Sequence, residues 1–320
     1  METGNEPLEG TSSTRWPWAG PIYCVLAAIL WSTSALFARS PLFDVWPTEI
    51  RGAALAFWRA VFALLILVPL IRKPTWDWRL VPMTICFSLM NWTYLTALVG
   101  GPPANAIWMQ NLAPAWVMLV TVFWLREPTI SKDWMMLGLC ISGVLFILAM
   151  EILHVPYSEK NRWWSPWLAI ASGLLYAGVI LSLRSLRALD PAWLIALNHI
   201  VTALVMLPIV LGTGASIPVG QMWFLLIGIG VIQMGSPYLL FAKGLKSTPS
   251  HIASLITLLE PVLLPVWVHL ARSGEPDYDP PHWWTWVGGF LILMGLFLRY
   301  LPIAEREKAE NSRRVRVPLR

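Results

Sequence analysis

Charge is scarce in this chain, and cysteine is scarcer still. Only 13% of the 320 residues are Asp, Glu, Lys or Arg, whereas an ordinary soluble domain has about 25%. The three cysteines fall in apolar stretches, without metal-binding spacing and in an odd number, so no disulfide framework is expected. With 57% hydrophobic residues, the composition predicts a chain that lies in a lipid bilayer.

Motifs of the common enzyme classes are also lacking. The sequence has no His-Glu-x-x-His, no paired acidic prenyl-diphosphate motif and no phosphate loop. Residues 214–218 lack the closing glycine of a nucleophile elbow and fall in a predicted loop. The formal charge of +5 comes from short loops and the C-terminal tail, not from a continuous basic patch. We therefore expect no enzyme activity, no cofactor, no bound metal and no nucleic-acid partner.

Instead, the sequence has ten apolar stretches of membrane-spanning length. Each approaches the ~20 residues that a helix needs to cross ~30 Å of hydrocarbon. The stretches lie at about 19–38, 51–71, 81–100, 104–124, 133–151, 165–183, 192–211, 222–243, 250–271 and 283–301. This pattern predicts an all-α integral membrane protein with ten transmembrane helices.

The chain carries one hydrophobic unit twice. Residues 249–270 match residues 102–123 at a shift of 147 positions, with Pro261 aligned to Pro114, and Arg39 finds Arg184 at a shift of 145. Because five helices is an odd number, the second unit enters the membrane from the opposite side, which predicts two inverted five-helix repeats. The predicted divisions are an N-terminal tail at 1–17, a first repeat at 18–151, a linker at 152–164, a second repeat at 165–301 and a basic tail at 302–320.

Lysine and arginine indicate the orientation. With a cytosolic N-terminus, basic residues on the cytosolic side outnumber those on the outer side by about three to one, as the positive-inside rule requires. Tryptophans lie at many span ends, where amphipathic rings favour the headgroup level. We therefore predict cytosolic N- and C-termini and an integral membrane location, in a bacterial inner (plasma) membrane.

With these features the chain resembles the EamA family of the drug/metabolite transporter superfamily. The resemblance covers about 20–300 and depends on the twofold repeat, Trp31 in the first helix, Arg59 in the second and Glu260-Pro261 in the ninth. Ser32 and Arg126 stand where glycine is common in the family. The resemblance implies a transporter fold made of two EamA-type repeats and a small-molecule substrate, with amino-acid or related-metabolite export as the commonest activity.

Candidate site residues are those whose chemistry is costly in hydrocarbon. A carboxylate or guanidinium at mid-span is normally paired, hydrated or functional, which singles out Glu260 and Arg59. The prolines Pro114 and Pro261 remove backbone donors and should break their helices where the chain faces protein or a wet cavity. The predicted cavity residues are Trp31, Tyr94, Trp108, Gln110, Asn111, Tyr176, Tyr238, Thr257 and Glu260, and further buried polar or charged positions are Arg59, Asn198, His199 and His251.

Several roles stay open for these residues. Glu260 is a proton site, a contact for a substrate ammonium or a structural acceptor, while Arg59 is a structural partner or a carboxylate clamp. The function that fits best is a secondary, non-ATP-driven transporter working by alternating access. It would export amino acids, amines or related metabolites, with protons or an exchange substrate as coupling partners. The alternatives are a membrane-embedded enzyme and a non-transporting sensor or assembly protein.

Overall fold

The protein is helical throughout the part of the chain that the structure describes. This structure, a computed structural model, describes residues 19–126, 129–154, 163–248, 250–275, 278 and 280–300, without the side chains of Ser250, His251 and Tyr300. These residues contain no strand. The predicted all-α class is therefore confirmed.

Several of the spans consist of two consecutive helices. The elements of the first half are α1 (Ala19–Ser32), α2 (Ser34–Ala38), η1 (Pro41–Phe43), α3 (Thr48–Leu67), η2 (Val68–Leu70), α4 (Leu80–Gly100), α5 (Pro103–Gln110), α6 (Ala113–Phe123) and α7 (Ser131–His154). Those of the second half are α8 (Ser165–Ser185), α9 (Pro191–Gly212), α10 (Met222–Ile227), the π-helix η4 (Gly228–Gly235), α11 (Ser236–Gly244), α12 (Ser250–Thr257), α13 (Leu259–Arg272) and α14 (Trp283–Tyr300).

Nine spans are long and apolar enough to cross a membrane within the described residues, when consecutive helices are taken together. The apolar helix at Trp283–Arg299 is shorter. The predicted stretch 19–38 agrees with the first of these spans, and the second begins at Thr48 where residue 51 was predicted. The count of ten transmembrane helices stays a prediction.

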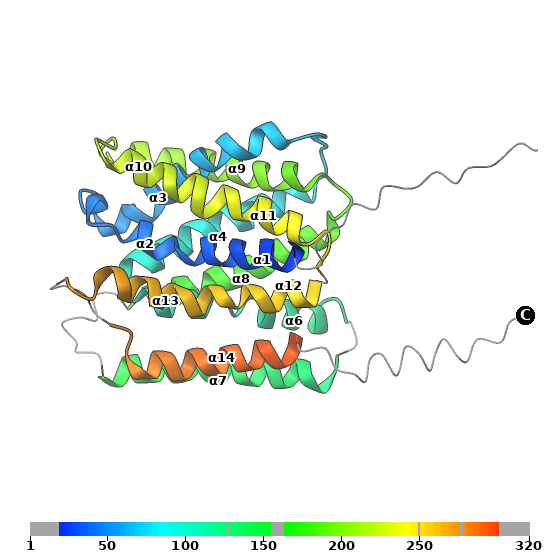
Figure 1. Ribbon diagram of the computed structural model, residues 1–320. Coiled ribbons are helices and arrows are strands. Elements are labelled where there is room, and N and C mark those ends of the chain that lie inside the picture. Colours follow the sequence, from blue (N-terminus) through cyan, green and yellow to red (C-terminus); the bar gives the residue numbers. More distant parts are fainter. Residues whose placement is uncertain are drawn as a thin grey trace, which may run out of the picture.

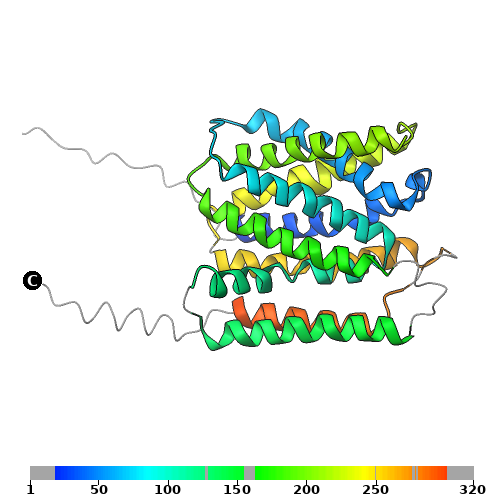
Figure 2. The same cartoon turned by 180° about the vertical axis from the view of Figure 1, so that it is seen from behind.

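The helices run side by side as one bundle (Figure 1). The helices α7 and α14 lie together along one edge, and both views place them as an outer pair (Figure 2). The most enclosed span is α4, which packs against α3, α8 and α9. This central position explains how an apolar protein keeps polar side chains such as Ser88 and Asn91 away from lipid, since both are buried there.

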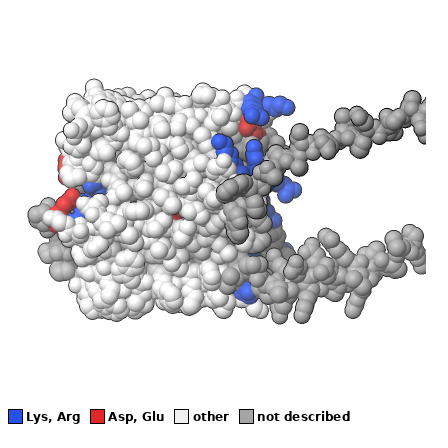
Figure 3. Space-filling model, viewed as in Figure 1, with Lys and Arg blue, Asp and Glu red and all other residues white. Residues whose placement is uncertain are grey.

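Most of the charge on the surface lies at the two ends of the bundle. Figure 3 shows Lys and Arg gathered at one end, a smaller group of charges at the other, and a white band between them with one small acidic area. The described chain begins and ends at the more basic end (Figure 1). An uncharged band between charged ends is the surface that a bilayer requires.

The tryptophans divide into two groups. Trp76, Trp78, Trp134, Trp163, Trp167, Trp283 and Trp286 are exposed near span ends, where headgroup contacts were predicted for them. Trp46 differs, because it is fully buried, stacks on Phe43 and donates from Nε1 to the carbonyl of Ser216 at 2.8 Å. Trp46 is therefore not an interfacial anchor, although it lies near a span end, because its ring joins the loop before α3 to the loop after α9.

Asp190 fixes the start of α9. Its carboxylate accepts from the backbone N–H of Ala192 at 3.0 Å and from those of Arg72 and Lys73 at 2.8 and 3.1 Å. Desolvation acts to raise the pKa of this carboxyl, but the backbone hydrogen bonds outweigh it and hold the pKa below the ordinary value. The N-cap therefore also ties the loop after α3 to the start of α9.

The seam between α7 and α14 depends on glycine. A Cβ atom on Gly288 would lie 2.7 Å from the carbonyl oxygen of Gly143 and 2.4 Å from Ile147. We expect Gly288→Val to destabilise the protein by about 1–3 kcal/mol, because backbone must move to admit the side chain. Gly138→Ala on α7 is the matched control, since a Cβ there meets nothing within 4 Å. Thermal unfolding in detergent should separate the two variants, and equal melting temperatures would contradict this packing.

Candidate functional site

Arg59 is the centre of a buried polar network. It lies near the middle of α3, is 4% exposed, and donates to the amide oxygen of Asn91 on α4 and to that of Gln233 on η4, the latter at 3.4 Å. The amide nitrogen of Asn91 donates to the carbonyl of Phe87 at 2.9 Å, and that of Gln233 donates to the carbonyl of Trp31 at 3.2 Å. Each amide is therefore oriented with its oxygen toward the guanidinium.

Glu260 supplies the opposite charge. Its half-buried carboxylate lies within electrostatic range of the Arg59 guanidinium and near the side chains of Tyr94 and Tyr238. Among the described residues, no hydrogen bond and no ion pair within 4 Å involves this carboxylate. The proton, substrate and structural roles of Glu260 all stay predictions.

Aromatic side chains lie around these two charges. The Tyr94 and Ser34 hydroxyls are 3.1 Å apart, and the ring of Tyr238 meets Trp31 edge-on with centroids 5.3 Å apart. The His199 ring contacts Phe87 edge-on at 5.1 Å, and its centroid lies 6.5 Å from that of Tyr238. Three predicted cavity residues, Trp31, Tyr94 and Tyr238, thus gather near Arg59 and Glu260.

Helix breaks occur close to this cluster in sequence. The fourth span changes from α5 to α6 at Asn111–Leu112, and the ninth changes from α12 to α13 at Leu258. Pro114 and Pro261 lie in the first turns of α6 and α13, where the missing N–H needs no partner within the helix. At the first break Gly173 of α8 is so close that a Cβ would lie 3.0 Å from the carbonyl oxygen of Gln110, so this broken backbone faces protein.

The other predicted residues lie in different surroundings. Trp108 is buried against Gly289 of α14, and Tyr176 is 39% exposed on α8. Gln110 is half-buried, while the side chains of Asn111 and Thr257 donate to carbonyls of their own helices. Asn198 is buried on α9 next to His199, and the His251 side chain lies outside the described part of the chain. Roles for these residues stay predictions.

Sequence reasoning missed the two amides that hold Arg59. Neither Asn91 nor Gln233 was singled out from the sequence as a site residue. The signal was present, since each is an amide near the middle of an apolar span and so needs a partner inside the bundle. A break in the first helix was missed too, where Ser32 and Thr33 bond back to the carbonyls of Ile29 and Leu30 at 2.7 Å each.

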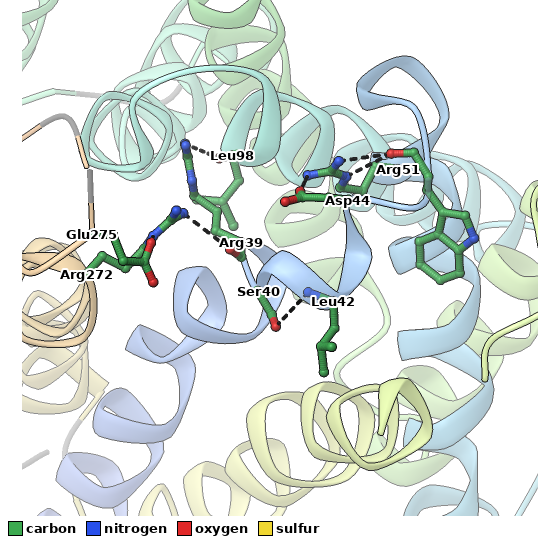
Figure 4. A network of polar contacts seen from close by, with 9 residues as sticks. Arg39, Ser40, Leu42, Asp44, Arg51, Leu98, Arg272 and Glu275 are labelled. Atoms are coloured by element: carbon green, nitrogen blue, oxygen red, sulfur yellow. Dashed lines mark hydrogen bonds and ion pairs between the residues drawn. The ribbon is translucent and has the colours of Figure 1, made fainter. Parts of the chain in front are cut away.

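A cavity of about 470 Å³ lies at the end of the bundle where α3 begins and α13 ends, opposite the start of α1 (Figure 1). Its lining includes Arg39, Asp44, Arg51, Val99, Arg272 and Tyr278. In Figure 4, Arg51 and Asp44 lie on the right of the view, and Arg39, Arg272 and Glu275 lie on the left. We call this cavity the vestibule. Among the described residues, no group of three or more His, Cys, Asp or Glu side chains is placed to hold a metal ion.

Comparisons with known proteins agree with this architecture. The EamA-like transporter family matches residues 18–149 and 163–301. An "uncharacterized transporter" of Archaeoglobus fulgidus is 26% identical over 248 residues, covering 76% of this chain and 84% of that protein. The "uncharacterized transporter YxxF" of Bacillus subtilis is 24% identical over 214 residues, covering 64% and 67%.

A solved structure titled "Crystal structure of protein" shares the fold, with a TM-score of 0.59, 17% identity and coverage of 88% of this chain and 96% of that one. The family match extends over well more than half of the residues and agrees with the resemblance found in the sequence. The apolar spans together with this match make the protein an integral membrane protein. The chain belongs to the EamA-like transporter family of the drug/metabolite transporter superfamily.

Proposed function

We propose that the protein is a secondary transporter that exports amino acids, amines or related small metabolites by alternating access. The observation that carries this proposal is the pair of opposite charges at mid-span, Arg59 and Glu260, which interact across the bundle beside broken helices. A guanidinium and a carboxylate together complement a solute that carries both charges. Buried charges at this depth are normally functional.

Two inverted five-helix repeats, at 18–151 and 165–301, are part of the same proposal. In an inverted repeat, each of the first five spans corresponds to the span five places later in the chain. The contact between α4 and α8 then corresponds to the contact between α11 and α1, and both contacts are extensive. By the same correspondence, the contact between α3 and η4 matches that between α9 and α4. The contacts between α3 and α9 and between α7 and α14 each join two corresponding spans, so each matches itself. This correspondence and the two separate family matches support the repeat, whose interface is where transporters of this kind bind substrate.

The orientation that we propose has both termini in the cytosol of a bacterial cell. Support comes from the gathering of Lys and Arg at the end where α1 begins and α14 ends. The vestibule would then face the outside. Protons or an exchange substrate are the proposed coupling partners.

Reconstitution tests this function. Purified protein in liposomes should take up labelled amino acids or amines faster than protein-free liposomes, and a pH gradient should change the rate if protons are coupled. No uptake in any class of solute, with product formed in detergent instead, would favour the membrane-enzyme alternative.

A further inference from the structure

The vestibule shares its helices with the polar cluster at mid-span. On α3, Arg51 lines the vestibule and Arg59 lies eight residues further along, a distance of about 12 Å at 1.5 Å per residue. On α13, Val268 lines the vestibule and Glu260 lies eight residues before it. The vestibule therefore lies at the outer ends of the helices that carry the mid-span cluster, on the side by which a transported solute would reach or leave that cluster.

Inside the vestibule, positive groups lie deep and negative groups lie at the rim. The Arg51 side chain is 13% exposed, and its Nη1 pairs at 2.7 Å with Asp44, whose side chain is 65% exposed. Likewise Arg272 is 21% exposed, and its Nε pairs at 2.5 Å with Glu275, which is 38% exposed. The walls therefore present guanidinium groups to the cavity, and their carboxylate partners are accessible to water.

Backbone contacts fix these guanidinium groups. Arg51 donates from Nε and Nη2 to the carbonyl of Trp46 at 3.2 and 2.9 Å, and Arg272 donates from Nη1 to the carbonyl of Arg39 at 3.3 Å (Figure 4). No described hydrogen bond uses Nη2 of Arg272. Once Glu275 is displaced, Nε and Nη2 of Arg272 can donate two hydrogen bonds to a carboxylate as a fork, and Arg51 can donate from Nη1 once Asp44 is displaced.

We infer that the vestibule is a binding site for the carboxylate of the transported solute, held by Arg51 and Arg272 in exchange for the rim acids Asp44 and Glu275. Ion pairs that face water contribute little to stability, so a solute carboxylate displaces them without unfolding the mouth. Because rim acids already partner both arginines, the site suits a single carboxylate better than a phosphate dianion. The inference rests on the proposed transport function and narrows its substrates to solutes with a carboxylate, which excludes simple amines.

Arginine modification tests the site without a transport assay. Full-length protein in detergent is treated with phenylglyoxal, and mass spectrometry follows the rate at which each arginine reacts. Two pairs of probes are used, leucine with leucinamide and acetate with acetamide. Within each pair, one compound has a carboxylate where the other has an amide. We expect leucine and acetate to slow the reaction of Arg51 and Arg272 by about two- to fivefold, the range set by a water-facing ion pair, and the amides to leave it unchanged. Arg79, paired with Asp77 at the opposite end, is the control arginine and should react at one rate throughout.

Two variants should change the protection in opposite ways. Glu275→Gln removes a competing carboxylate, so protection of Arg272 should appear at lower leucine concentration, whereas Arg272→Gln should abolish protection at Arg51. Equal protection by acids and amides, or protection by inorganic phosphate alone, would overturn the inference. So would protection that appears only in nanodiscs of anionic phosphatidylglycerol, which would make the ligand a lipid headgroup. Failure of the proposed function is a separate result, because absent uptake in liposomes leaves the modification rates unaffected.

Discussion

Arg59→Leu should cause the largest loss of stability of any single substitution in the cluster at mid-span. The amide oxygens of Asn91 and Gln233 would both lose their charged donor inside the bundle. Each unsatisfied buried acceptor costs about 1–3 kcal/mol, so with two such acceptors the free energy of unfolding should fall by about 2–6 kcal/mol. Glu260 would also lose the cation that faces it. Melting of the detergent-solubilised protein measures the effect.

Arg79→Leu is the matched control. Arg79 also holds carboxylate and carbonyl oxygens, those of Asp77 and Ser185, but it does so at the water-facing end of the bundle. We expect little change in melting temperature for this variant. Arg59→Lys should be intermediate, because it keeps the charge but not the fork of donors that reaches two amides. A melting temperature for Arg59→Leu equal to that of Arg79→Leu would show that the network adds nothing to stability.

Glu260→Gln should have the largest effect on transport with little effect on stability. The carboxylate accepts no hydrogen bond from a described residue, so the isosteric amide removes charge without breaking a contact. If the carboxylate binds substrate or proton, uptake should fall by about tenfold or more, which corresponds to at least ~1.4 kcal/mol of lost interaction. Uptake with and without a pH gradient distinguishes the two roles, because only a proton site loses the dependence on the gradient.

The structural role predicts the reverse pattern for the same variant. A lower melting temperature with normal uptake in the surviving protein would make Glu260 a packing residue. Unchanged stability, affinity and pH dependence together would exclude all three roles. Asp133→Asn is a useful comparison, since Asp133 is buried and paired with Arg299, so its loss should lower stability.

The helical class and the span bounds could be predicted because hydropathy reports directly on the length of apolar helices. The stretches 19–38 and 104–124 differ from the observed Ala19–Ala38 and Pro103–Phe123 by at most one residue at either end. The fate of Pro114 and Pro261 was less accessible. A proline within an apolar run indicates a break, but the run alone does not say whether the helix kinks or ends and restarts. In the structure both spans end one helix and start another just before the proline.

Partners at the site could be predicted only by type. The sequence indicated that Arg59 needs a partner inside the bundle, yet Asn91 and Gln233 come from spans whose neighbours in space depend on tertiary packing. The π-helix η4, which carries Gln233, is likewise set by packing, since Gly230 lies against Phe62 and Arg59 of α3. The vestibule was not anticipated, because Arg39, Arg51 and Arg272 are far apart in the sequence and only the packing of the helices brings them to one cavity.

Counterflow in liposomes tests the central claim most directly, namely that Arg59 and Glu260 form the site of an alternating-access transporter. Liposomes are loaded with an unlabelled mixture of amino acids and amines, and entry of the labelled mixture is followed without any ion gradient. We predict transient accumulation of label with the native protein. Glu260→Gln, reconstituted to the same folded amount, should show none if the carboxylate contacts substrate, whereas a proton site should keep this exchange and lose only the dependence of net uptake on a pH gradient. Equal accumulation by both proteins with an unchanged dependence on the pH gradient, or no accumulation by the native protein for any solute, would contradict this assignment.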